Sequence, residues 1–347
     1  MRPRLGFLGL GWIGRRRLEA VAEADVADIA VLADPLIGSI EELAGIAPDA
    51  LRVETLDALL GEPLDGVVIA TPSAQHAQQA EICLDRGLAV FCQKPLARTR
   101  DEVEALVAAA RAADRLLSVD MCYRETAALC AIKRLVGAGA LGSIYAADFV
   151  FHNAYGPGQD WYYARHVSGG GCVLDLGIHL LDQLYWLLGW RDLRVAHRQL
   201  LHRGRPWAID DDTVEDFAHI VFEGPGGALA RVTCSWRAPA GRDACLTLEL
   251  FGTGGGARMS NVGGSFYDFI AERLDSRHAT VIAAPPDDWG GRAVVRWAQA
   301  IADGGGYSSS CESQVTVAGW IDEIYRGSRF EGSNYRTLVT ERPSTAY

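Results

Sequence analysis

The sequence of 347 residues has no apolar run approaching the ~18 residues that a membrane-spanning helix needs, so no membrane span is expected. None of its eight cysteines forms a Cys-x-x-Cys pair, and we interpret all of them as reduced, buried thiols rather than as disulfides or metal ligands. Basic residues are in the minority, since 33 Lys and Arg against 44 Asp and Glu give a net charge of −11. This acidic balance argues against nucleic acid, anionic membranes and polyanionic substrates as partners.

The start of the chain leads directly into a strand-like run that carries the first motif, so we expect no cleaved signal peptide. Reduced cysteines without a signal peptide predict a cytoplasmic protein. Because single hydrophobic cores stop growing near ~250–300 residues, a chain of this length is expected to form two domains. We place them at residues 1–122 and 123–347.

Short apolar strands alternate with helices over the first 121 residues. The expected strands are 4–10, 29–33, 67–70, 89–92 and 116–120, and the expected helices are 13–24, 40–43, 56–60, 76–86 and 101–113. Strands of this kind, separated by helices, are typical of a parallel sheet covered on both faces. The first half is therefore predicted to be an α/β Rossmann domain with a doubly wound parallel sheet.

The second half has longer strands of alternating polarity. We expect strands at 144–153, 216–222, 228–236 and 244–251, a turn at 224–227, and helices at 126–137, 173–188 and 313–325. Alternation joined by tight turns indicates antiparallel pairing. This half is predicted to be an α+β domain with a large, mainly antiparallel open sheet, and the late helix, about 313–326, is expected to pack back on the body.

A glycine motif closes the first predicted strand and opens the first helix. Gly9-Leu10-Gly11-Trp12-Ile13-Gly14 matches G-x-G-x-x-G in the context that dinucleotide binding requires. The first glycine allows a tight turn, the second lets backbone approach a pyrophosphate, and the third lets helix and strand pack closely. The free N–H groups of the helix N-terminus would face the phosphates.

Asp34 ends the second predicted strand, about 20 residues beyond the loop, where a carboxylate can accept hydrogen bonds from both ribose hydroxyls of NAD. The same charge would repel the 2′-phosphate of NADP. Pro35 follows without a nearby basic residue, so NAD is the preferred cofactor and NADP remains open. Arg15, Arg16 and Arg17 are expected to form a solvated helix face.

Three further segments resemble the Gfo/Idh/MocA family (glucose–fructose oxidoreductase, inositol dehydrogenase and relatives). They are Ala70-Thr71-Pro72-Ser73-Ala74-Gln75-His76, then Phe91-Cys92-Gln93-Lys94-Pro95, which is similar to the family's E-K-P motif, and Gly169-Gly170-Gly171-Cys172-Val173-Leu174-Asp175-Leu176-Gly177-Ile178-His179. With the glycine loop they follow the family's order over most of residues 4–190. The rest matches only in general layout.

The resemblance implies roles for named residues. Lys94, at the carboxyl end of a parallel strand, would hydrogen-bond the substrate oxygen, and His179 would be the general acid/base with Asp175 beside it. Asp175 and His179 are four apart in a predicted helix and so share one face. Gln93 departs from the family's usual Glu, which contacts the cofactor near the nicotinamide ribose; it loses the charge and keeps an acceptor oxygen.

Further positions complete the predicted site. The predicted cofactor contacts also include Thr71, Pro72, His76, Gln93, Lys94 and Trp161, the last expected to face the nicotinamide. The predicted substrate contacts are Tyr123, Arg124, Asn153, Arg165 and His166, with Tyr162 as a further candidate. Asp182, on the same helix face as His179, is interpreted as structural, and no metal site is expected.

The leading interpretation is an NAD(P)-dependent oxidoreductase that transfers hydride between a secondary alcohol of a sugar, polyol or related cyclic compound and the nicotinamide ring. Two alternatives stay open. One is an enzyme of the same architecture that retains NAD and cleaves a glycosidic bond or acts as a lyase. The other is a non-catalytic dinucleotide-binding regulator. By analogy with relatives, homo-oligomerisation through the C-terminal sheet is expected.

Overall fold

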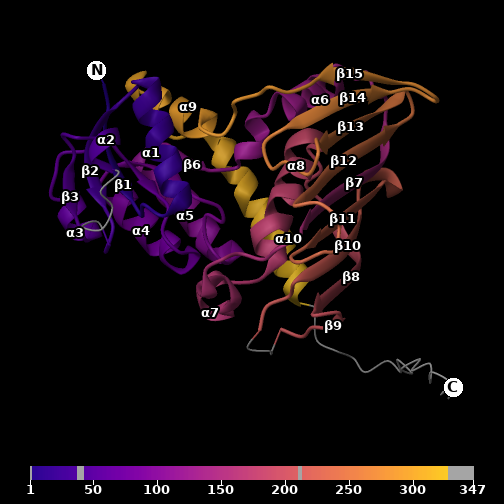
Figure 1. The fold of residues 1–347 in the computed structure, drawn as a ribbon, viewed down its shortest axis with the longest axis horizontal. Coiled ribbons are helices and arrows are strands. Elements are labelled where there is room, and N and C mark those ends of the chain that lie inside the picture. Colours follow the sequence, from indigo (N-terminus) through magenta and orange to yellow (C-terminus); the bar gives the residue numbers. More distant parts are fainter. Residues whose placement is uncertain (1, 37–42, 210–212, 327–347) are drawn as a thin grey trace, which may run out of the picture.

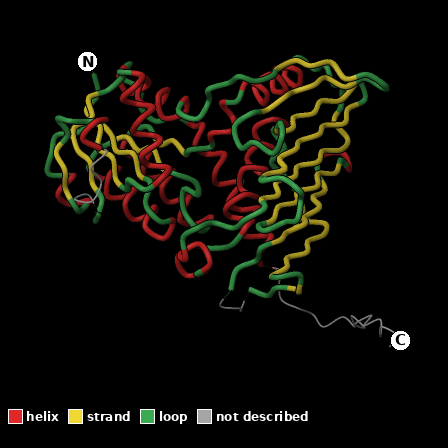
Figure 2. Tube along the Cα trace, in the orientation of Figure 1, coloured by secondary structure: helices red, strands yellow, loops and turns green. Residues whose placement is uncertain are grey.

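The computed structural model describes residues 2–36, 43–209 and 213–326. Two sheets form two layers with helices between them (Figures 1 and 2). The front sheet consists of six parallel strands in the order β3-β2-β1-β4-β5-β6, and the rear sheet of nine strands in the order β15-β14-β13-β12-β7-β11-β10-β8-β9. The predicted fold class, a Rossmann domain followed by a mainly antiparallel sheet, is confirmed.

The front sheet has short strands, and β4 and β5 are buried along their whole length. Continuous burial explains why these strands are uniformly apolar rather than alternating. The strands are β1 (Arg4–Leu8), β2 (Asp28–Ala33), β3 (Leu51–Val53), β4 (Gly66–Ile69), β5 (Ala89–Cys92) and β6 (Leu117–Val119). The helices are α1 (Trp12–Ala24), α2 (Leu43–Ile46), α3 (Leu56–Leu59), α4 (Ser73–Asp85) and α5 (Arg100–Ala113). The helix expected at 40–43 lies outside the described residues except for its last position, where α2 begins.

The rear sheet is centred on β7, which pairs parallel with β11 and antiparallel with β12. Its strands are β7 (Ile144–Asn153), β8 (Arg194–His202), β9 (Arg205–Pro206), β10 (Phe217–Glu223), β11 (Leu229–Ser235), β12 (Ala244–Gly252), β13 (Gly255–Asn261), β14 (Phe269–Leu274) and β15 (Ala279–Ala283). Helices α6 (Ala127–Gly137), α8 (Ile178–Leu188) and α10 (Ser313–Arg326) pack on the face turned toward the front sheet (Figure 1). Among the described residues, no helix is both long and apolar enough to cross a bilayer.

The sequence analysis missed strands in both sheets and one long helix. Strands β3, β8, β9, β13, β14 and β15 were not predicted, and β13 shows one reason: it opens with two glycines and ends with asparagine, which are poor strand formers. Helix α9 (Arg292–Ala302) was also missed. In contrast, α10 lies where the late helix was predicted and packs on both α5 and α8.

Helix α9 returns the chain to the front sheet. The indole ring of Trp297 lies 5.7 Å from the ring of Phe91 on β5. A Cβ atom on Gly66 would come within 2.8 Å of the same indole, so only glycine lets the helix approach β4 this closely. Residues that follow the rear sheet therefore complete the cover of the front sheet.

Candidate active site

A cleft of about 1660 Å³ opens between the two layers. This volume exceeds the ~300–1,000 Å³ of a typical small-ligand pocket, so the cleft has room for a dinucleotide together with a substrate. The front layer contributes the glycine loop and the carboxyl ends of its strands, which is where doubly wound sheets bind ligands. The rear layer contributes residues of β7, the segment before α8, and the loop before α9.

The glycine loop fits a dinucleotide phosphate on geometric grounds. Gly9 has φ +86°, and a Cβ there would meet the Ala70 carbonyl at 2.7 Å; a Cβ on Gly14 would lie 2.0 Å from the Gly9 oxygen. A Cβ on Gly11 would meet nothing within 4 Å, which leaves bare backbone facing the cleft. Trp12 and Ile13 start α1 beside it and also line the cleft. The open N-terminus of α1 suits an anion.

Asp34 follows β2 at the cleft wall. Its Oδ2 accepts the Leu10 N–H at 2.8 Å and its Oδ1 accepts the Leu36 N–H at 2.9 Å. These two bonds fix the carboxylate beside the glycine loop, and each oxygen retains a lone pair for a ligand hydroxyl.

His76 joins two of the motifs. Its Nδ1 lies 2.7 Å from the Pro95 carbonyl and its Nε2 lies 2.7 Å from the Thr71 carbonyl, so the imidazole bridges the ends of β4 and β5. Burial lowers the pKa of His76. Thr71, Pro72 and His76 all line the cleft, and the imidazole holds the two strand ends at a fixed separation.

Lys94 and Asp175 meet across the cleft. Lys94 Nζ donates to Asp175 Oδ1 at 2.6 Å and to the Asp175 carbonyl at 2.7 Å. Trp236, just after β11, donates from Nε1 to Asp175 Oδ2 at 2.9 Å. Burial acts to lower the pKa of Lys94, but the charge of Asp175 outweighs it and the net pKa is raised. The ammonium therefore stays charged and is held at a defined point.

His179 lies beside this pair, at the start of α8. Residues Val173–Gly177 form a π-helical turn, a feature that is frequent at functional sites, and the α-helix begins after it. His179 is buried, lines the cleft, and meets Tyr123 edge-to-face with ring centroids 4.9 Å apart. Its pKa lies well below 6.5, because of burial first and then the charges of Lys94 and Arg17. The imidazole is neutral at pH 7 and able to accept a proton.

Glu215 fixes the triple-glycine turn before that helix. Its carboxylate accepts the Gly171 N–H at 3.1 Å, the Val173 N–H at 2.9 Å and the Tyr325 hydroxyl at 2.8 Å. A Cβ on Gly171 would lie 1.9 Å from the Glu215 carbonyl oxygen, and one on Gly170 would lie 2.2 Å from the Tyr325 oxygen. Packing therefore requires glycine at both positions. The tight turn that they allow places Asp175 in the cleft wall.

Glu215 predicts a pH-dependent contribution to stability. Burial raises its pKa from 4.5 to about 7, against the opposing hydrogen bonds. Between those values the folded protein holds a proton that the unfolded chain releases, so this contribution falls as pH rises, by at most about 1.4 kcal/mol per pH unit. The melting temperature of wild type minus that of Glu215→Gln should therefore decrease from about pH 5 to pH 8 in thermal unfolding. A difference that grows with pH would show that the hydrogen bonds outweigh burial.

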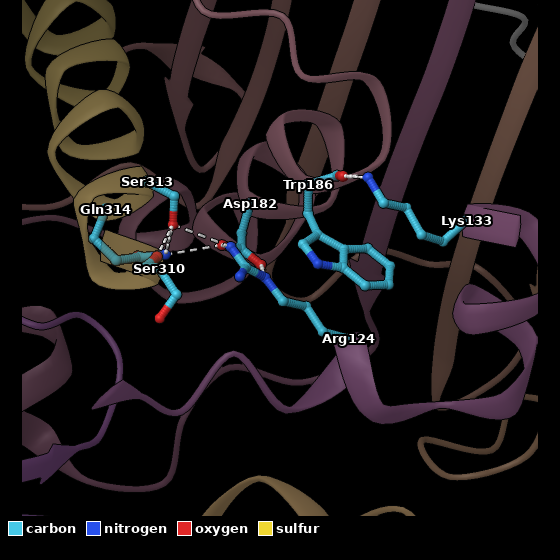
Figure 3. A network of polar contacts seen from close by, with 7 residues as sticks. All are labelled: Arg124, Lys133, Asp182, Trp186, Ser310, Ser313 and Gln314. Atoms are coloured by element: carbon cyan, nitrogen blue, oxygen red, sulfur yellow. Dashed lines mark hydrogen bonds and ion pairs between the residues drawn. The ribbon is translucent and has the colours of Figure 1, made fainter. Parts of the chain in front are cut away.

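Three predicted substrate contacts lie outside the residues that line the cleft. Arg124 is bound to Asp182 by two hydrogen bonds of 2.8 and 2.5 Å, in a network that includes Ser313 and Gln314 of α10 (Figure 3). Arg165 donates to the Ile209 carbonyl, and His166 is exposed and gives its carbonyl to Arg98. These residues were predicted as substrate contacts because they are polar and lie near a motif. In the structure, Arg124 and Arg165 are instead bound to partners within the protein, away from the cleft.

The remaining candidates do line the cleft. Tyr123 and Asn153 lie on its rear wall, and Asn153 Oδ1 accepts the Tyr155 N–H at 3.1 Å. Trp161 stacks on Tyr162 with ring centroids 3.8 Å apart. Aromatic residues at this end of the cleft also include Tyr155, Phe266, Tyr267 and Trp289. The structure thus offers flat apolar surfaces together with hydrogen-bonding groups.

Sequence reasoning overlooked residues of the cleft wall and residues behind it that hold the site in place. Arg17 was expected to be solvated but is 5% exposed, because its guanidinium pairs with Asp120 at 2.5 Å. Asp120 follows β6 at the same sheet edge as Lys94, and that position was a usable signal. Trp236 and Glu215 carry no local motif, since their contacts with residues 171–175 arise only from the folded chain.

Comparison with known proteins agrees with this geometry. The profile of the oxidoreductase family with an NAD-binding Rossmann fold matches residues 4–121, and that of the GFO/IDH/MocA C-terminal domain matches residues 130–258. The rhizopine catabolism protein MocA of Rhizobium meliloti is 31% identical over 73% of this chain and 77% of its own length. The chain belongs to the Gfo/Idh/MocA oxidoreductase family.

Other members of the Gfo/Idh/MocA family extend the match over nearly the whole chain. D-apiose dehydrogenase of Paraburkholderia graminis is 28% identical over 97% of this chain and 91% of its own. Among solved structures, a 3-ketoreductase from Actinomadura kijaniata in complex with NADP shares the fold, with a TM-score of 0.81 over 94% of this chain and 98% of that one at 22% identity. The protein is an NAD(P)-dependent oxidoreductase of this family.

Proposed function

We propose that the protein transfers hydride between a secondary alcohol of a sugar, polyol or related cyclic compound and the nicotinamide of NAD. The observation that carries this proposal is the meeting of Lys94 with Asp175 across the cleft, beside the neutral imidazole of His179. A charged donor and a proton acceptor at one point are what alcohol oxidation needs from the protein.

The residues divide the work as follows. When bound, the cofactor supplies the hydride acceptor or donor. Lys94 hydrogen-bonds the substrate oxygen and stabilises the negative charge that develops there. Asp175 holds the Lys94 ammonium in place and is itself held by the indole N–H of Trp236. His179 takes the hydroxyl proton at a ring nitrogen during oxidation and returns it during reduction. The aromatic stack of Trp161 on Tyr162 orients the substrate.

The substrate class rests on the cleft and on the relatives. Aromatic faces and polar groups at its rear end suit the apolar faces and hydroxyls of a ring-shaped polyol. The relatives are named for rhizopine catabolism and for D-apiose. A screen of neutral sugars, cyclic polyols and their amino derivatives with NAD and NADP, followed by reduced-cofactor absorbance, tests the proposal. Turnover with tightly held NAD and no net NADH would instead favour the NAD-retaining lyase-type alternative, and cofactor binding without any turnover would favour the regulator.

The preference for NAD depends on Asp34. The backbone N–H groups of Leu10 and Leu36 hold the Asp34 carboxylate in place. Replacing Asp34 with Ala removes this acceptor for the ribose hydroxyls of NAD, and it also removes a charge that repels the 2′-phosphate of NADP. We expect NAD binding to weaken roughly tenfold, as for a lost hydrogen bond to a charged group, and the ratio of NADP to NAD affinity to rise. Fluorescence titration of both reduced cofactors measures this. Unchanged affinities for both cofactors would assign Asp34 a purely structural role.

Two broader properties belong to the same proposal. The outer face of the rear sheet is turned away from the helices (Figure 1), and we propose that it supports a homo-oligomer, which light scattering would test. All eight cysteines are free thiols, which fits a cytoplasmic setting. Cell fractionation would test that location.

A further inference from the structure

A buried polar group of three side chains forms part of the cleft wall beside Lys94. Asp120 is 1% exposed, Arg17 is 5% exposed and Gln93 is 7% exposed. Arg17 Nε donates to Asp120 Oδ2 at 2.5 Å and its Nη1 donates to the Gly290 carbonyl, while Gln93 Nε2 donates to the same Asp120 oxygen. The three residues come from α1, the end of β5 and the end of β6, so the group joins three elements of the front layer.

This arrangement decides which way the Gln93 amide points. An ionised carboxylate can only accept hydrogen bonds, so Gln93 must present its NH₂ group to Asp120. Its Oε1 is then the atom left over. Among the described residues, none donates a hydrogen bond to Oε1. The oxygen is also not among the fully buried polar atoms that lack a partner. Gln93 lines the cleft, so the amide offers it an acceptor.

Charge balance explains why residue 93 is uncharged. One guanidinium and one carboxylate, both almost fully buried, already neutralise each other in this wall. A glutamate at 93 would add a second carboxylate against Asp120, whose Oδ1 already has no hydrogen-bond partner among the described residues. Burying an uncompensated charge is costly, so the Arg17–Asp120 pair requires a neutral donor at this position.

The place of Gln93 identifies what its oxygen meets. The strand order of the front sheet puts the glycine loop and Asp34 on one side of the switch point and β5 on the other. A dinucleotide laid across that edge from the loop therefore reaches β5 with its nicotinamide half. That half carries hydrogen-bond donors, namely ribose hydroxyls and the carboxamide NH₂.

We propose that Arg17 and Asp120 are positioning residues: they lock the Gln93 amide with its oxygen toward the cleft, so that residue 93 can make the contact with the nicotinamide half of the cofactor that the family resemblance implies for this position. This inference rests on the proposed function, because it needs a dinucleotide in the cleft. It assigns a role to a buried ion pair that lies beside, and not within, the Lys94–Asp175–His179 set.

A charge-conserving swap tests the proposal. Gln93→Glu places two carboxylates against one guanidinium, and Asp120→Asn leaves Arg17 without a counter-charge, so each should weaken NADH binding roughly tenfold. In the double variant, the amide introduced at position 120 can accept from Arg17 and donate to the carboxylate introduced at position 93, so one carboxylate, one amide and one guanidinium are again matched. We expect its NADH dissociation constant to recover to within about threefold of wild type.

The control is Asp182→Asn, which removes a similarly buried carboxylate from Arg124 outside the cleft (Figure 3). It should lower the melting temperature and leave NADH affinity unaltered. The inference is overturned if the double variant binds NADH no more tightly than the weaker-binding of the two single variants, or if Gln93→Glu binds NADH like wild type. It is also overturned if Asp182→Asn weakens NADH binding as much as the single variants do. Failure of wild type to bind NADH at all would instead reject the proposed function, and the inference with it.

Discussion

Replacing His179 with asparagine is expected to lower turnover by ~10²–10⁴-fold, the usual effect of losing a general acid/base, while NADH affinity persists. Burial and the nearby charges of Lys94 and Arg17 keep the imidazole neutral, so it is ready to take a proton from the substrate. Because the folded-state pKa is depressed, oxidation by wild type should hold its rate as pH falls through 6.5 and decline only in more acidic solution. Steady-state kinetics across pH, with NADH titration, measures both effects.

The matched control is His152→Asn. His152 is a partly buried histidine of β7 whose Nδ1 lies 2.8 Å from the Ser235 hydroxyl, and it does not line the cleft. Its replacement should leave turnover essentially unchanged. If His179→Asn behaved like this control, the proton acceptor would have to be sought elsewhere in the cleft.

Replacing Lys94 with methionine should reduce turnover by ~10²–10³-fold, the scale seen when one preorganised charge-stabilising donor is removed. Methionine preserves much of the length of the side chain but cannot stabilise charge on the substrate oxygen. It also leaves Asp175 with the Trp236 indole N–H as its side-chain donor, so the carboxylate loses the counter-charge that the cleft provides. Turnover and NADH affinity, measured together, separate the chemical step from cofactor binding.

Lys133→Met serves as the comparison. Lys133 is also partly buried, and its ammonium donates to the Trp186 carbonyl on α8, away from the cleft (Figure 3). This variant should keep its activity. Should Lys94→Met retain more than about a tenth of wild-type turnover, the ammonium cannot be a main source of transition-state stabilisation.

Much of the front layer was predictable because local signals suffice there. Uniformly apolar strands, a glycine loop and Asp34 at a strand end each point to one arrangement, and β5 has the predicted bounds, as does β7 in the rear sheet. Helix α9 was also within reach: Val294, Trp297 and Ala298 have the spacing of a buried helical face. The interpretation of Arg17 as solvated was wrong because its partner Asp120 lies far away in sequence.

Other features of the site follow only from tertiary structure. Arg124 was a reasonable substrate candidate, yet its bidentate pairing with Asp182 could not be inferred from the spacing of either residue. The π-helical turn that carries Asp175 was predicted as ordinary helix, and its shape depends on Glu215, which lies between two later strands. The motifs predicted the reacting residues, but not the side chains that hold those residues in position.

The packing of Trp297 against Gly66 and Phe91 has a consequence for biosynthesis. A ribosome makes the glycine loop first and α9 near the end of the described chain, after every strand of the rear sheet. A nascent chain that has emerged only through β15 therefore still lacks one of the helices that shield its earliest strands. The oldest part of the polypeptide is among the last to be finished.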